Sequence, residues 1–136
     1  MEQKPLTLQD VFDKNWQYFI VENKPFGYID FHCTYLGSNG EKCAIGVCIP
    51  EEIANKITEH NGCNVSFLLS KYKEVSDLFD KNIDFTALSN LQHLHDDCAK
   101  ECADAPIDSD MYNKTHSLYK KMLTEFAEKY NLILPS

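Results

Sequence analysis

The chain contains no arginine, so all thirteen of its basic residues are lysines. Arginine supplies the planar guanidinium fork that recognises phosphates and base edges in most nucleic-acid interfaces. The formal net charge of −8 at pH 7 is also unfavourable for a polyanionic partner. We therefore expect that this protein does not bind nucleic acid.

Long apolar runs and nucleotide-binding motifs are missing as well. With cysteine left out, no uninterrupted apolar run exceeds four residues, whereas a membrane-spanning helix needs about 20. Residues 1–10 have neither the basic nor the apolar region of a secretory signal. We expect a cytoplasmic protein without a membrane partner, whose six cysteines are thiols or metal ligands rather than a disulfide framework. Neither G-x-x-x-x-G-K-[ST] nor G-x-G-x-x-G occurs.

The length and the hydrophobic spacing predict an α+β fold, as one mostly helical domain over residues 1–136. We expect about five helices and one antiparallel β-hairpin near residues 28–49. Thr7 and Asp10 form a capping pattern for the first helix, which should stop before Pro25. The other helical patterns cover residues 50–62, 65–79, 85–103 and 109–130, the last with Met111, Thr115, Leu118, Met122 and Phe126 on one side.

Two alternating segments predict the hairpin. Apolar residues recur at every second position from 29 to 35 and again from 43 to 49. A three-residue loop, Ser38–Gly40, would place both apolar sets on one face, with Tyr35 opposite Cys43 and Cys33 opposite Ile45.

The segment LQHLHDDCAKEC concentrates potential metal ligands. His95, Cys98 and Cys102 share one face of the predicted helix, but residues 95 and 102 are about 10.5 Å apart along its axis, too far to share one zinc ion. A zinc site would therefore combine His95 and Cys98 with Cys43 and Cys33 of the hairpin. The alternative, in which both helix cysteines are core residues and His95 is hydrogen-bonded, is favoured because buried free cysteine is common.

A reactive thiol is a second possibility. Cys48 lies on the polar face of the predicted strand, which His32 shares, and Asp30 could orient that histidine. No cysteine-protease signature surrounds these residues.

Two motifs resemble those of a known group of proteins. Residues 33–52 contain C-x-Y…G-x-K-C-A-I-G-x-x-I-P-x-E, and residues 88–96 contain L-x-x-L-Q-x-x-H-D. They are similar to a group of short, uncharacterised bacterial and phage proteins with a Cys-rich G-x-x-C-A-[IV]-G-x-L-I-P-[DE]-E hairpin and a downstream L-Q-x-x-H-D helix. Members often carry cysteine directly after the C-A-I-G glycine, where this chain has Val47, and aspartate where it has Glu51. The resemblance implies that the hairpin and His95–Asp96 form one structural unit of a bacterial or phage accessory protein.

The net charge is concentrated in one segment. Residues 74–110 contain ten acidic residues and two lysines, which accounts for the whole charge of −8. We expect a non-enzymatic protein that acts by protein–protein interaction, as an accessory or inhibitor protein, toward a partner with a basic surface. The expected interaction face comprises Asp97, Glu101, Asp104, Asp108 and Asp110. The alternative is a zinc or thiol site with hydrolase or redox-sensor activity, and self-association through the hairpin edge is compatible with either.

Overall fold

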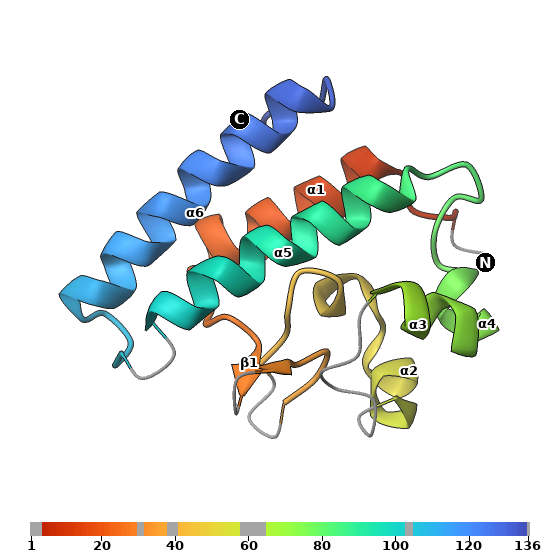
Figure 1. Cartoon of the computed structure of the whole chain (residues 1–136), viewed down its shortest axis with the longest axis horizontal. Helices are drawn as coiled ribbons and strands as arrows, with labels where there is room; N and C mark the ends of the chain where they lie inside the picture. The colour runs from red at the N-terminus through yellow and green to blue at the C-terminus, as the bar shows by residue number, and fades with distance from the viewer. Residues whose placement is uncertain (1–3, 30–31, 38–40, 58–64, 103–104, 136) are drawn as a thin grey trace.

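A computed structural model describes residues 4–29, 32–37, 41–57, 65–102 and 105–135. Two long helices dominate it, α5 (Phe85–Cys102) and α6 (Asp110–Lys129), which run alongside each other (Figure 1). The described part contains four further α-helices: α1 (Leu8–Asn15), α2 (Glu51–Lys56), α3 (Val65–Lys71) and α4 (Lys73–Ser76). A π-helix, η1 (Trp16–Val21), extends α1, and a short 3₁₀ helix, η2 (Gly46–Cys48), precedes α2. None of the described helices has the length and apolarity needed to cross a membrane.

The first helix begins and ends as the sequence predicts. The Thr7 hydroxyl accepts a hydrogen bond from the Asp10 N–H at 3.2 Å, and the Asp10 carboxylate accepts one from the Thr7 N–H at 3.0 Å. This capping box satisfies two backbone donors that the helix cannot pair internally. After η1 the backbone turns through Asn23 in the left-handed region, with φ 53°, just before Pro25.

The predicted hairpin over residues 28–49 is wrong, and so is the α+β class, because the described chain is helical. Among the described residues the strands are two of two residues each, β1 (Tyr28–Ile29) and β2 (His32–Cys33), with Tyr28 opposite Cys33. Two isolated bridges, of Leu6 with Phe79 and of Phe26 with Lys42, add to this pairing. The expected pairs, Tyr35 with Cys43 and Cys33 with Ile45, are not formed. The predicted loop at residues 38–40 lies outside the described residues.

Local hydrogen bonds explain why the second strand does not form. The N–H of Val47 donates to the Cys43 carbonyl at 3.1 Å, and the N–H of Cys48 donates to the Ile45 carbonyl at 3.0 Å, so the chain coils into η2. The Ile45 N–H donates to a side chain, Gln92, at 3.1 Å. Both the even-numbered and the odd-numbered residues are buried here: Ala44 and Gly46 as well as Cys43 and Ile45. The alternation in the sequence therefore does not separate an inner face from an outer one.

The other predicted helices differ from the observed ones in where they end and in which side is buried. The helix expected over residues 50–62 ends at Lys56, and the residues after 57 lie outside the described part until Val65. Where the sequence predicts one helical pattern over residues 65–79, the structure has two helices, α3 and α4, separated by Tyr72. On α6 the core side is rotated by about one position from the expected face. Met111 and Leu118 are exposed, whereas these residues are buried: Tyr112, Thr115, His116, Tyr119, Leu123, Phe126 and Ala127.

A side chain at Gly27 should destabilise the fold. A Cβ atom there would lie 2.2 Å from the Lys42 carbonyl carbon and 2.6 Å from the Thr34 carbonyl oxygen, and both are backbone atoms that cannot rotate away. We expect Gly27→Ala to lower the free energy of unfolding by about 2–3 kcal/mol, as overpacking does, measured by urea denaturation.

The matched control is Gly37→Ala, whose Cβ would meet the flexible Glu41 side chain at 3.0 Å. This change should have a much smaller effect. Equal unfolding midpoints for the two variants would contradict the close packing of residues 27, 34 and 42.

Candidate functional site

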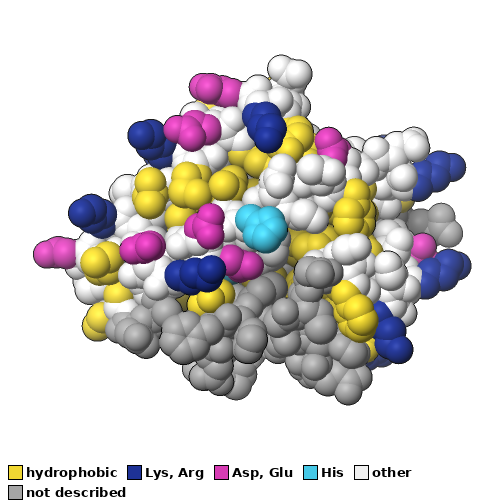
Figure 2. All heavy atoms as spheres, in the orientation of Figure 1, with side chains coloured by type: hydrophobic (Ala, Val, Ile, Leu, Met, Phe, Trp, Pro, Cys, Tyr) yellow, Lys and Arg dark blue, Asp and Glu magenta, His cyan; other side chains and the backbone are white. Residues whose placement is uncertain are grey.

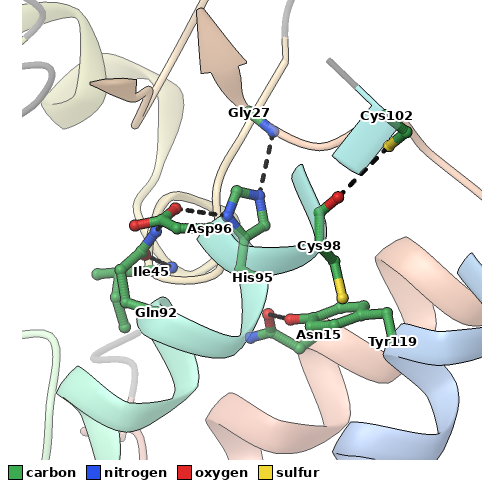
Figure 3. Close-up of polar contacts among 9 residues, drawn as sticks. All are labelled: Asn15, Gly27, Ile45, Gln92, His95, Asp96, Cys98, Cys102 and Tyr119. Atoms are coloured by element: carbon green, nitrogen blue, oxygen red, sulfur yellow. Dashed lines mark hydrogen bonds and ion pairs between the residues drawn. The ribbon is translucent and has the colours of Figure 1, made fainter. Parts of the chain in front are cut away.

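A buried polar network on α5 joins the two motifs (Figure 3). The Gln92 carbonyl oxygen accepts a hydrogen bond from the Ile45 N–H at 3.1 Å, and the Gln92 amide donates to Asp96 Oδ1 at 2.9 Å. Asp96 Oδ1 lies 2.9 Å from His95 Nδ1. His95 Nε2 lies 3.2 Å from the Gly27 N–H. The network therefore connects α5 to Ile45 through Gln92 and to Gly27 through His95.

The environment of His95 determines its protonation. The ring is fully buried, with ring centroids of Phe19 and Phe26 at 5.4 and 5.2 Å. Burial lowers the pKa of His95, and the hydrogen bond and charge of Asp96 oppose this in part. The neutral ring donates from Nδ1 to Asp96 and accepts at Nε2 from the Gly27 N–H, which it shares with the Lys42 carbonyl at 2.9 Å. Both nitrogens are used inside the protein, so His95 has no nitrogen directed at a substrate.

The expected zinc ligands are not assembled in the described structure. Cys98 Sγ lies 3.5 Å from Met122 Sδ, and Cys102 Sγ lies 3.7 Å from the Cys98 carbonyl oxygen. Burial raises the pKa of the Cys98 thiol to about 12. Cys43 is buried as well, and the Cys33 side chain lies outside the described part. No group of three or more His, Cys, Asp or Glu side chains among the described residues could hold a metal ion.

Cys48, the candidate nucleophile, is buried rather than exposed. Its exposed fraction is 6%, because the residue ends η2 instead of lying on the outer face of a strand. Burial raises the pKa of its thiol to about 12, which the charge of Lys14 opposes only in part. A thiol with this pKa is almost entirely protonated near neutral pH and is a poor nucleophile. The side chain of His32 and the whole of Asp30 lie outside the described part.

The expected acidic face is exposed where it can be described. Asp97 and Glu101 lie on the outer side of α5 near its C-terminal end, and Asp108 and Asp110 lie at the start of α6. Asp104 lies outside the described residues. Figure 2 shows acidic side chains interspersed with apolar ones and some lysines over the ends of these two helices, toward the left. We refer to the exposed residues 97, 101, 107, 108, 110, 111 and 118 as the α5–α6 face.

Sequence reasoning missed a second buried histidine, His116. Its Nδ1 lies 3.0 Å from the Tyr112 carbonyl, and its Nε2 lies 3.0 Å from the Lys24 carbonyl. Its ring stacks with those of Phe26 and Tyr112, at centroid distances of 4.5 and 4.2 Å. The sequence signal was the four-residue spacing of Tyr112 and His116 on a helix. This histidine attaches the turn after η1 to α6, and its ring is 6% exposed.

Comparisons of the chain with protein-family models, with curated proteins and with solved structures gave no significant match.

Replacement of Gln92 should be costly. Gln92→Leu has a similar volume but leaves the buried Ile45 N–H without the acceptor that it has in this structure. An unsatisfied buried donor costs about 1–3 kcal/mol, and we expect a loss of that size in urea denaturation. The control is Gln17→Leu, since Gln17 is exposed and bonds only to Glu22 at 3.3 Å. A Gln92 variant as stable as this control would contradict the role of the amide.

His95 should make the stability depend on pH. Below pH about 6.5 the ring of the unfolded chain binds a proton, whereas the lowered pKa of His95 in the folded protein keeps the ring neutral. The unfolded state then binds more protons. The stabilising contribution is complete above pH 6.5 and is lost as the pH falls toward the folded-state pKa.

We expect the wild type to lose up to about 1.4 kcal/mol per pH unit from this residue between pH 6.5 and 5. His95→Gln, which keeps an acceptor, should lack this component, as followed by urea denaturation at each pH. His93→Gln changes an exposed histidine of the same helix and should retain it. An unchanged pH profile in His95→Gln would contradict the assignment.

Proposed function

We propose that this protein is a non-enzymatic binding protein that recognises a basic protein surface with its α5–α6 face. One observation carries the proposal. Asp97, Glu101, Asp108 and Asp110 are exposed, and the described residues place no lysine within 4.0 Å of their carboxylates. None of the four therefore forms an ion pair with a described lysine, so their carboxylates are accessible to a partner.

Exposed apolar side chains accompany these carboxylates. Ile107, Met111 and Leu118 are 63%, 49% and 45% exposed. Ile107 precedes α6, and Met111 and Leu118 lie in its first half. Figure 2 shows apolar side chains among the acidic ones over the ends of α5 and α6. Protein interfaces commonly combine an apolar centre, rich in methionine, with a polar rim. The mixture fits a partner surface that carries lysine or arginine around apolar side chains.

The electrostatics would act mainly on association. Acidic residues at the rim of an interface attract a basic partner over a distance of about 10 Å at moderate ionic strength and accelerate encounter. The apolar residues would then contribute to the lifetime of the complex. Binding by this face should accordingly weaken as salt is added.

The buried candidate sites support a binding function over catalysis. His95 uses both ring nitrogens inside the protein, and burial raises the pKa of Cys48 and Cys98. Cys48, Cys98 and Cys102 are free thiols, which supports a reducing, cytoplasmic setting. The motif resemblance supports a bacterial or phage accessory or inhibitor protein. Self-association through a hairpin edge is not retained, because the hairpin is not formed.

Charge reversal on α5 tests the proposal. The double variant Asp97→Lys, Glu101→Lys should recover at least about tenfold less of a specific partner from a bacterial lysate than the wild type does. Quantitative mass spectrometry of the captured proteins gives this ratio. The wild-type recovery should also decrease as sodium chloride is increased.

The matched control is Glu125→Lys, Glu128→Lys, which makes the same charge change at exposed positions near the other end of α6. It should retain the partner. Equal losses in the two double variants, or capture that is independent of salt, would overturn the proposal. Met111→Ser combined with Leu118→Ser should shorten the lifetime of the complex without removing its salt dependence.

A further inference from the structure

A cavity of about 390 Å³ gathers three lysines in this acidic protein. Lys4 comes from the segment before α1, Lys14 from the last turn of α1, and Lys42 from the segment before η2. Apolar side chains form much of the remaining wall: Leu6, Val47, Ile49 and Leu78. Three lysines from three segments of the chain thus line one partly apolar cavity.

The lysines of this cavity outnumber its carboxylates. One carboxylate, that of Asp77, lies in its wall, and this group is 4.0 Å from Lys73 Nζ. Among the described residues, no carboxylate lies within 4.0 Å of the ammonium groups of Lys4, Lys14 or Lys42. Such a group of like charges is unfavourable by itself and is relieved when an anion binds.

The walls of the cavity are fixed by backbone hydrogen bonds. The Leu6 N–H donates to the Leu78 carbonyl at 2.7 Å, and the Asp80 N–H donates to the Leu6 carbonyl at 2.8 Å. These bonds attach the N-terminal segment to the residues after α4. On the opposite wall, the Ile49 N–H donates to the Gly46 carbonyl at 3.1 Å. A ligand would therefore meet a cavity that is already formed, which lowers the entropic cost of binding.

We propose that this cavity binds a phosphate monoester of a small apolar molecule, with the phosphate among Lys4, Lys14 and Lys42. Lysine ammonium groups are point charges with three rotatable donors, and they accommodate a tetrahedral dianion without the planar geometry that arginine imposes. A phosphate monoester carries about 1.5 to 2 negative charges near pH 7, which the positive charges of three lysines can balance. The apolar walls suit the organic group, and the volume lies in the range of about 300–1,000 Å³ of small-molecule sites.

This site is separate from the α5–α6 face. In Figure 1 the N-terminal segment lies on the right near α3 and α4, whereas the junction of α5 and α6 lies on the left. The two faces also differ in the sign of their charge. The inference therefore goes beyond the proposed binding function and can fail or succeed independently of it.

Titration of the full ¹⁵N-labelled chain with phenyl phosphate at pH 7.5 tests this site. We expect saturable shifts of the backbone amide signals of Lys42, Val47 and Ile49. Inorganic phosphate, which lacks the apolar group, should bind more weakly, and benzyl alcohol, which lacks the charge, should give no saturable shift. Absence of saturation by phenyl phosphate at millimolar concentration would overturn the proposal, and equal affinity for inorganic phosphate would overturn the ester assignment.

Charge variants locate the binding. Lys14→Glu combined with Lys42→Glu should weaken phenyl phosphate at least about tenfold. The matched control is Lys114→Glu with Lys121→Glu, at exposed positions of α6. If the first double variant does not fold, Lys14→Gln and Lys42→Gln made singly should each weaken binding. Equal weakening in the control would show non-specific charge attraction and overturn the site.

Discussion

The hydrogen bond from the Ile45 N–H to the side chain of Gln92 holds together parts of the chain that are 47 residues apart. The segment around residue 45 is buried, and a buried amide donor needs a partner. Neither a sheet nor a long helix supplies that partner here. Since α5 supplies it from a side chain, the irregular segment can pack against the helix without losing a hydrogen bond. The Gln92 amide also donates to Asp96, and Asp96 orients His95 against Gly27. One network therefore positions both Ile45 and Gly27 against α5.

Local signals in the sequence predicted several elements. The capping box of Thr7 and Asp10, the stop before Pro25, and the extents of α5 and α6 all follow from side chains within a few residues of the feature. Such local signals could not establish whether residues 43–49 form a strand of a hairpin. Alternating apolar residues from 43 to 49 are compatible with a strand and equally with a segment that is buried on all sides. The Gln92 side chain of α5 accepts a hydrogen bond from the Ile45 N–H and thereby favours the buried irregular segment over a strand. No pattern within residues 43–49 reveals this acceptor.

The face of α6 illustrates a second limit of sequence reasoning. Hydrophobic spacing grouped Met111 and Leu118 on one side of the helix, yet both are exposed and Tyr112, His116 and Tyr119 are buried instead. These aromatic side chains can be buried because their polar atoms find partners, such as the Asn23 carbonyl for the Tyr112 hydroxyl at 2.9 Å. The apolar residues displaced to the surface became part of the α5–α6 face. The candidate acidic residues were predictable because exposure of a carboxylate is the default, whereas the lysine cavity was not, since its three lysines are far apart in sequence.

The interior of this protein explains why its function is sought on the surface. Among the described residues, no buried side-chain nitrogen or oxygen lacks a hydrogen-bond partner. A catalytic group must keep an atom available for the substrate, whereas His95 and His116 use their ring nitrogens within the protein, and burial raises the pKa of the Cys48 and Cys98 thiols. The carboxylates of the α5–α6 face and the three lysines of the cavity form no ion pair with another described residue. These two surfaces, opposite in charge, are where we propose that a protein partner and an anionic ligand bind.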